Sequence, residues 1–351
     1  MKRKMNRSVR TKLTALGLCV TLMFTALTGC GNKDAKETLS TEQQSVTESI
    51  GSTENVTEAA ENEVTEGASE ENPVTFTDAL GRDVTVTSHD RVAAMIGSFA
   101  DVWLLSGGEL VATANDSWES LDLDLGDDVV NLGSIQEPNT EALLAAQPDL
   151  VIASTNTTSN VEMENMLTEA GITVAYFDVS DFDAYLQMLD ICTDITGRKD
   201  LYEKNGLEVQ KQIEEIKARV DDSHPSVLFL RAAASGVKAK GSEGSVGGEL
   251  LKDLGCVNIA DSDSGLLDNL SLEAIVTADP DYIFVTTQGT DTDAALENVQ
   301  ETLIDSPVWS SLTAVKENHY YVLDKRLYNL KPNARWGEAY KELADILYPE
   351  N

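Results

Sequence analysis

The chain has 351 residues, with 26 basic and 60 acidic side chains and a formal net charge of −34. A charge this negative argues against nucleic acid and against an anionic bilayer as binding surfaces. It does not exclude an anionic small ligand, because a site within an acidic protein can be locally basic.

Residues 1–30 contain a basic, an apolar and a small-residue part in succession. Six basic side chains and no acidic one occur among the first twelve residues, and an apolar stretch follows at 13–27. That stretch is shorter than the ~20 residues of a membrane-spanning helix and is typical of a cleaved signal peptide. The run Leu27-Thr28-Gly29-Cys30 resembles the bacterial lipobox, which implies cleavage before Cys30 and acylation of its sulfur with a palmitate-type chain. An ordinary signal peptide with an incidental cysteine is the alternative.

Residues 31–73 differ sharply from what precedes them. They hold eleven acidic residues, two lysines and no aromatic residue. Such a segment buries too little apolar surface to offset the entropy of ordering it, and its like charges extend it. We therefore predict a signal peptide at 1–29 and a lipidated Cys30 followed by a disordered tether to residue 73. The protein would stand on the extracellular face of the cell membrane, as in Gram-positive bacteria.

Residues 74–351 are long enough for one large domain or two modest lobes. Removing the six positive charges of the signal and the nine net negative charges of the tether from −34 leaves −31 on this part. Cys192 and Cys256 lie in apolar surroundings and are predicted to be buried, and the sequence does not decide whether they pair. The histidines His89, His224 and His319 share no ligand-like spacing, so we predict no metal site.

Apolar runs rich in β-branched residues predict strands, with helical patterns between them. In chain order the first four strands are expected at 92–96, 110–113, 150–153 and 173–177, with helices at 99–105 and 161–170. An amphipathic helix of about 20 residues is expected at 200–220, spanning roughly 30 Å, with Gly206 as its weak point. Three further strands are expected at 227–230, 282–285 and 320–323.

A helix–turn–strand pattern occurs twice, 132 residues apart. The segment 141–152 (EALLAAQPDLVI) matches the segment 273–284 (EAIVTADPDYIF) in its Glu, two of its Ala residues, its Pro and its Asp. Each predicts a helix that ends before proline, a tight turn and a buried strand, which is the unit of a parallel α/β sheet. We interpret the repetition as two similar lobes at 74–198 and 223–351, joined by a connecting helix at 199–222. Coincidence is the alternative, because Pro-Asp turns are common in α/β proteins.

These segments, taken in order, resemble the class III periplasmic-binding-protein family, the ABC transporter substrate-binding lipoproteins for iron–siderophores, haem and cobalamin. The resemblance covers 74–351 and is carried by 76–86 (FTDALGRDVTV), 91–94 (RVAA), 133–134 (GS), 138–141 (PNTE), 147–152 (QPDLVI), 250–255 (LLKDLG), 278–285 (ADPDYIFV), 309–316 (WSSLTAVK) and 321–324 (YVLD). It implies an α/β fold of two Rossmann-like lobes with central parallel sheets, joined by one long rigid helix. It also implies a ligand cleft between the lobes with modest closure, and a protein that is not an enzyme.

Glu141 and Glu273 occupy equivalent positions in the two repeats. In the resembled family a surface glutamate at this place in each lobe pairs with arginines of the importer's membrane subunits, so we predict permease docking for both. Two fixed carboxylates on separate lobes would set the register of the complex. The alternative is that each glutamate only stabilises the first turn of its helix, and both roles are compatible.

The ligand site is expected beyond the carboxyl ends of the strands in both lobes. Arg231, directly after a buried run, is the expected clamp for a carboxylate or for the negative charge of a ferric complex. Trp118 and Tyr328 are expected stacking surfaces, with core packing as the alternative. The full set of predicted ligand-binding residues is Ser98, Phe99, Trp118, Gln136, Thr155, Asn156, Arg231, Ser245, Thr287, Gln288 and Tyr328.

The expected ligand is a siderophore-type ferric chelate, with haem or cobalamin as alternatives and no intrinsic cofactor. Members of the family with a similar ending often carry a histidine just upstream of it, where this chain has Tyr328-Asn329-Leu330, which weakens a histidine-ligated haem. The expected partners are the permease subunits of an ABC importer and its cytoplasmic ATPase, with a monomeric binding protein. A surface lipoprotein hydrolase on an α/β scaffold is the alternative from another class, because a fold alone does not define a function.

Overall fold

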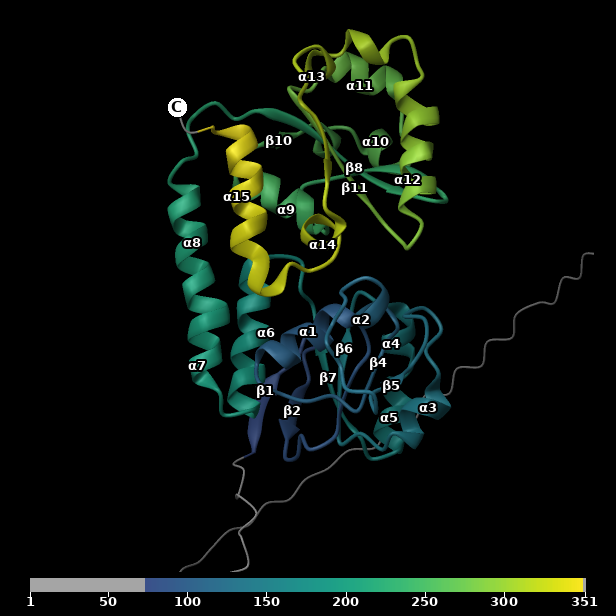
Figure 1. The fold of residues 1–351 in the computed structure, drawn as a ribbon, viewed down its shortest axis with the longest axis vertical. Coiled ribbons are helices and arrows are strands. Elements are labelled where there is room, and N and C mark those ends of the chain that lie inside the picture. Colours follow the sequence, from purple (N-terminus) through teal and green to yellow (C-terminus); the bar gives the residue numbers. More distant parts are fainter. Residues whose placement is uncertain (1–72, 350–351) are drawn as a thin grey trace, which may run out of the picture. The chain divides into compact units, whose positions relative to one another are not determined.

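The computed structural model describes residues 73–349 (Figure 1). The predicted signal peptide, the lipidated Cys30 and the tether therefore lie outside the described residues. Within 73–349 two separate five-stranded sheets each carry their own helices, so the predicted α/β class is confirmed. Both sheets fall inside the predicted lobe ranges, whose boundaries stay predictions. None of the described helices has both the length and the apolar character needed to cross a membrane.

The first lobe is built on a five-stranded parallel sheet of order β5-β4-β3-β6-β7. An antiparallel hairpin of β1 and β2 precedes it. All five residues of β6 are buried, which explains its unbroken apolar sequence. The elements are β1 Val74–Thr77, β2 Asp83–Val86, β3 Val92–Ala94, α1 Gly97–Leu105, β4 Ala112–Thr113, α2 Asp116–Glu119, β5 Val130–Asn131, α3 Thr140–Ala145, β6 Leu150–Ser154, α4 Thr158–Glu162, α5 Glu164–Glu169, β7 Thr173–Phe177 and α6 Phe182–Ile195.

The second lobe has the parallel order β10-β8-β11-β12, with β9 added antiparallel to β8. Its central strand β11 is buried in all but its first residue, and β8 is buried from Val227 to Leu230. The elements are β8 Ser226–Ala233, β9 Gly236–Lys240, α9 Val246–Asp253, β10 Val257–Asn258, α10 Ser264–Asp268, α11 Leu272–Ala278, β11 Tyr282–Thr287, α12 Thr292–Val299, α13 Thr313–Lys316, β12 Tyr320–Leu323, α14 Lys325–Tyr328 and α15 Trp336–Leu347, with a π-helical turn at Gln300–Ile304 and 3₁₀ turns at Ile259–Asp261, Trp309–Ser311 and Asn333–Arg335.

A continuous helical segment connects the lobes and runs from α7 (Lys199–Tyr202) through a π-helical turn (Glu203–Leu207) into α8 (Glu208–Lys217). It ends before the predicted residue 220. Gly206 lies in the π turn, where an added Cβ would stand 2.7 Å from Cδ1 of Leu186 on α6, so the glycine permits close packing at this irregular turn. The Asn205 side-chain amide donates to the Leu105 carbonyl at 2.8 Å, which ties the connecting helix to the first lobe. Its other end lies beside α15 (Figure 1).

The repeated pattern has the same structure in both lobes. Gln147 and Asp279, the residues before the two prolines, have positive φ angles of 47° and 43° and end α3 and α11. The aspartate after each proline then binds the start of the neighbouring strand. Asp149 accepts from the backbone N–H groups of Asp90 and Arg91 at 3.1 and 3.2 Å, and Asp281 accepts from that of Ser226 at 2.8 Å. The shared sequence therefore encodes the same turn in each lobe, followed by an aspartate whose side chain accepts hydrogen bonds from the backbone of the neighbouring strand's start.

Some local predictions were wrong. The helix predicted at 161–170 is two short helices, α4 and α5, that meet at Met163. The strands β5, β9 and β10 were not predicted, because two are dipeptides and β9 is rich in lysine. Cys192 and Cys256 are buried as predicted and are free thiols, and burial raises the pKa of each to about 12.

Two helical glycines give a matched test of packing in the second lobe. An added Cβ at Gly248 would stand 2.1 Å from the backbone oxygen of Gly241, whereas at Gly337 it would meet the mobile end of Gln212. We expect Gly248→Ala to lower the free energy of unfolding by about 1–3 kcal/mol, as overpacking does. Gly337→Ala should be neutral or stabilise by up to ~1 kcal/mol through helix propensity. Urea unfolding of both variants measures the difference, and equal stabilities would contradict the close contact at Gly248.

Candidate functional site

A cavity of about 470 Å³ lies between the lobes, at the carboxyl ends of strands from both sheets. This is where parallel α/β sheets present ligand-binding groups. The first lobe contributes the end of β6 and residues that follow β3, β6 and β7. The second contributes β8, β9, β11, the start of α9 with the loop before it, and the end of α14 with the chain after it. The lining residues are Ile96, Ser154, Asn156, Thr157, Asp178, Val179, Ser180, Phe229, Arg231, Lys240, Gly244, Ser245, Val246, Thr286, Gln288, Tyr328, Asn329, Leu330 and Lys331.

Three cations line this cleft: Arg231, Lys240 and Lys331. Lys240 on β9 is directly opposite Phe229 on β8, and Arg231 is two residues further along β8. Because paired residues and residues two apart project from the same face of a sheet, Arg231 and Lys240 share the cleft face. Within the described residues no hydrogen bond or ion pair engages any of the three charged groups. The cleft thus has a surplus of unpaired positive charge in a strongly acidic protein.

Burial in the cleft disfavours these charges. It lowers the pKa of Arg231 and of Lys240, and for Lys240 the neighbouring Arg231 and Lys238 lower it further. The pKa of Lys331 is also lowered by burial, although the charges of Asp178 and Asp116 act in the opposite direction. An anion entering the cleft would restore the stability of all three charged forms, since an opposite charge nearby favours ionisation.

Neutral polar groups complete the cleft. The hydroxyl of Thr286 is fully buried and has no hydrogen-bond partner among the residues that the structure describes. On the first lobe, the Asn156 amide donates to the Asp178 carboxylate at 2.5 Å. Hydroxyl and amide groups next to unpaired cations suit a ligand that carries both oxygen acceptors and net negative charge.

The predicted ligand-binding residues fall into two groups. The cleft brings together Asn156, Arg231, Ser245, Gln288 and Tyr328. Tyr328 is 1% exposed, and its hydroxyl donates to the Ala339 carbonyl on α15 at 3.0 Å, so it forms a wall rather than a free stacking surface. Those that do not line the cavity are Ser98, Phe99, Trp118, Gln136, Thr155 and Thr287.

The residues outside the cavity have other surroundings. Phe99 is fully buried in the core against Phe177, and the Ser98 carbonyl accepts a hydrogen bond from Asn333. Thr287 is buried at the end of β11. Trp118 is half-buried on α2, Thr155 is half-buried after β6, and Gln136 is exposed in a loop.

Several lining residues were missed from the sequence. Asp178, Val179 and Ser180 directly follow the predicted strand at 173–177, so the same strand-end rule would have found them. Lys240 could have been found from the alternation of Val237 and Ala239 with lysines. No local pattern marks Lys331, which only the return of the chain after α14 brings to the cleft.

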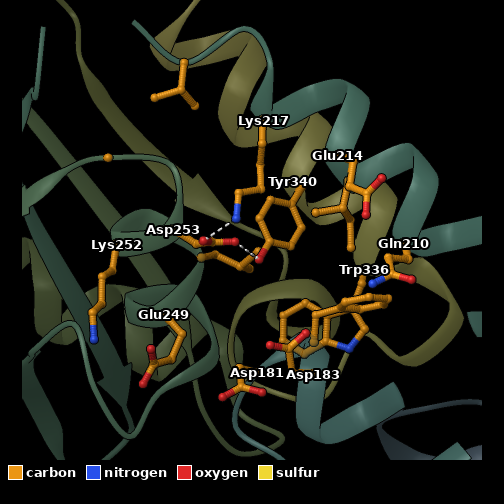
Figure 2. Close-up of a pocket in the computed structure, with 15 residues that line it drawn as sticks. Asp181, Asp183, Gln210, Glu214, Lys217, Glu249, Lys252, Asp253, Trp336 and Tyr340 are labelled. Carbon is orange, nitrogen blue, oxygen red and sulfur yellow. Dashed lines mark hydrogen bonds and ion pairs between the residues drawn. The ribbon is translucent and has the colours of Figure 1, made fainter. Parts of the chain in front are cut away.

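A second cavity of about 710 Å³ lies among α6, α8, α9 and α15 (Figure 2). Its central charges satisfy one another: the Lys217 ammonium donates to Asp253 at 2.5 Å, and the Tyr340 hydroxyl donates to the same carboxylate at 2.6 Å. This network ties the connecting helix to α9 and α15. We therefore interpret this cavity as a structural contact between the connecting helix, α9 and α15. We place the ligand site in the cleft, where the three cations form no ion pair within the described residues.

The predicted docking glutamates occupy matching sites. Glu141 and Glu273 lie in the first turns of α3 and α11, capped by Asn139 and Ser271. Both side chains are exposed and neither makes an ion pair within residues 73–349. The structure thus places each glutamate where the helix dipole favours it, and leaves each carboxylate accessible.

Two α/β lobes, one connecting helix and a basic cleft at the strand ends define a bilobal substrate-binding protein. Among the described residues no group of three or more His, Cys, Asp or Glu side chains is placed to hold a metal ion. The periplasmic binding protein family model matches residues 92–327, and the chain belongs to that family. The expected class III membership is thereby confirmed, together with the expectation of a binding protein rather than an enzyme.

Three relatives illustrate the relationship. The iron-uptake system-binding protein of Bacillus subtilis (strain 168) is 24% identical over 280 residues, which cover 79% of this chain and 85% of that protein. Staphylococcus aureus SirA complexed with staphyloferrin B has a TM-score of 0.62 at 22% identity, covering 78% of this chain and 97% of SirA. S. aureus IsdE complexed with heme has a TM-score of 0.59 at 18% identity, covering 74% and 98%. The structural likenesses show that the fold is shared.

Proposed function

We propose that this protein captures a siderophore-type ferric chelate of net negative charge and delivers it to an ABC importer. The observation that carries the proposal is the set of three unpaired, partly buried cations, Arg231, Lys240 and Lys331, in the interlobe cleft. Cations that form no ion pair in a partly buried site are unfavourable alone and become more favourable when an anion binds. The iron-uptake and staphyloferrin relatives support this ligand class.

Haem is the alternative that the relatives also raise, and the cleft favours the chelate. Protein side chains that bind haem iron are His, Cys, Met and Tyr. Among the described residues lining the cleft, only Tyr328 is of these types, and its hydroxyl already bonds Ala339 and Glu342 at 3.0 Å. A chelate whose iron is fully held by its own oxygens requires no such ligand from the protein. For cobalamin, the other alternative, we identify no feature among the described lining residues that favours it over the chelate.

The remaining parts of the proposal concern attachment and delivery. Acylation of Cys30 would hold the mature protein on the outer face of the cell membrane, with residues 31–73 as its tether. Glu141 and Glu273 would dock the two lobes on the permease subunits, while the cytoplasmic ATPase drives uptake. A single chain carries both glutamates and the whole cleft, which supports a monomer as the working unit.

Titration of the purified mature protein tests the ligand class. Tryptophan fluorescence is followed while ferric citrate, ferric staphyloferrin B, haemin and cyanocobalamin are added in separate experiments. We expect saturable binding of one equivalent of a ferric carboxylate complex, with the complex recovered chemically unchanged. Tighter binding of haemin than of either ferric complex would overturn the proposed ligand class, and conversion of the ligand would favour the hydrolase alternative.

A further inference from the structure

The segment that begins within α14 and runs to Asn333 contacts both lobes. On the second lobe, Tyr328 is anchored to α15 by its hydroxyl, which donates to the Ala339 carbonyl at 3.0 Å. On the first lobe, the Arg326 guanidinium donates to the Leu121 carbonyl at 2.6 Å. Residues 326–333, which we call the strap, are therefore bonded to both lobes, separately from the connecting helix.

Asn333 makes the second attachment to the first lobe. Its side-chain amide nitrogen donates to the Ser98 carbonyl at 2.8 Å and to the Asp101 carboxylate at 2.7 Å, both on α1. Asn333 is fully buried, has a φ of 53°, and its amide oxygen has no hydrogen-bond partner within residues 73–349. A positive φ and an unsatisfied buried acceptor are both unfavourable. This conformation is therefore stabilised by the two hydrogen bonds to α1 and not by a local backbone preference.

Lys331 lies on the strap between these two attachments and lines the ligand cleft. The charges of Asp178 and Asp116, both from the first lobe, favour its protonated form, but neither carboxylate forms an ion pair with it. A lysine on a four-carbon stem has many rotamers, and a backbone fixed on both sides restricts where its ammonium group can be. The attachments on either side thus determine where this cation stands relative to the first lobe.

We propose that Asn333 is a positioning residue for ligand binding, which holds the strap on α1 and so places Lys331 in the cleft. This inference rests on the proposed function of the cleft as an anion site. Arg326 performs the same task at the other end of the strap. Neither residue lines the cavity, so their effect on the ligand is exerted through Lys331 and through the spacing of the lobes.

The decisive variant is Asn333→Gly, because glycine adopts a positive φ without strain while the whole side chain, including the amide that bonds α1, is removed. The matched control is Asn298→Ala: the Asn298 amide also donates to two carbonyls, those of Ala233 and Ala234 at 2.8 and 3.1 Å, within the second lobe alone. Thermal melts of both variants confirm that they fold. A second variant, Asn333→Asp, places a carboxylate against Asp101 and should have the larger effect through like-charge repulsion.

Two readouts separate positioning from general stability. In the ligand-free mature protein, hydrogen exchange of the strap and of α1 should be faster in Asn333→Gly than in wild type, and unchanged in Asn298→Ala. If a correctly placed strap is then populated about one-tenth of the time, affinity for ferric citrate or ferric staphyloferrin B falls about tenfold. Unchanged hydrogen exchange in Asn333→Gly would contradict the inference that Asn333 holds the strap on α1. Faster exchange with wild-type affinity overturns the positioning role.

The failure of this inference is distinguishable from failure of the proposed function. If no ferric complex binds the wild-type protein, the proposed function is wrong, whereas exchange in the ligand-free state still decides whether Asn333 holds the strap on α1. If the wild type binds a ferric complex and Asn298→Ala loses as much affinity as Asn333→Gly, the effect is one of overall stability and the positioning role is wrong.

Discussion

Arg231→Gln is expected to weaken the binding of ferric citrate or ferric staphyloferrin B by roughly tenfold to a hundredfold. A hydrogen bond to a charged group contributes about 1.5–3 kcal/mol, which corresponds to that range of affinity. Arg231 is partly buried in the cleft and makes no bond that the substitution would break within the described residues. The loss should therefore appear in ligand affinity and not in the midpoint of thermal unfolding.

Lys238→Gln is the matched control for this prediction. Lys238 pairs with Arg231 across β8 and β9, carries the same charge, is exposed and does not line the cleft. Lys238 projects from the same sheet face as Arg231 and its charge already lowers the pKa of Lys240, so its replacement changes the electrostatic field at the cleft without removing a lining group, and salt screens that field. Calorimetric titration of both variants at physiological salt distinguishes a direct contact between Arg231 and the ligand from a change in the electrostatic field at the cleft. Equal losses of affinity would show that Arg231 does not contact the ligand.

Lys240→Gln and Lys331→Gln extend the test to the other two cations. Each is expected to lose affinity for the same ferric complexes, because each charge lines the cleft and forms no ion pair with another residue of 73–349. Losses in a double variant should differ from the sum of the single losses where the ligand contacts both cations, since neighbouring residues couple. A ferric trihydroxamate without net charge serves as the comparison, and it should be less sensitive to all three substitutions.

The parts of the fold that the sequence predicts well are those determined by local patterns. The Gln147-Pro148 and Asp279-Pro280 turns end helices because the residue before proline disfavours the helical region, and both turns occur as expected. The buried strands β6 and β11 stand out because both faces of a central parallel strand are covered. The short edge strands β5 and β10 carry no such signal, since a dipeptide has no periodicity.

The candidate site is predictable only where strand ends alone define it. Arg231 follows an apolar run, and the rule that sites form at strand ends leads to it directly. Phe99 follows a strand as well, but α1 begins at Gly97 and directs that ring into the core. Lys331 reaches the cleft through the contacts of Arg326 and Asn333 with the first lobe, which lie more than 200 residues away in sequence. Tertiary contacts of this kind leave no mark in a single sequence.

Charge reversal at the docking glutamates is expected to abolish uptake while leaving ligand affinity unchanged. Glu141→Lys and Glu273→Lys each place a cation where the proposed importer surface supplies arginines, and like charges at an interface cost several kcal/mol. Both residues are exposed and unpaired in the described part of the chain, and neither lines the cleft. The free energy of unfolding should fall by only about 0.3–1 kcal/mol in each variant, because a carboxylate in the first helical turn interacts favourably with the helix dipole.

Glu169→Lys on α5 and Glu297→Lys on α12 are the controls, one on each lobe, with the same change of charge on an exposed helix. Uptake of radioactive ferric complex is measured in cells whose own copy of the protein is replaced by each variant, and affinity is measured on the purified chains. We expect at least tenfold slower uptake for the docking variants and near-normal uptake for the controls. Normal transport by both docking variants would reduce Glu141 and Glu273 to helix-stabilising residues. Equal loss in all four variants would indicate that net charge, rather than two defined contacts, governs delivery.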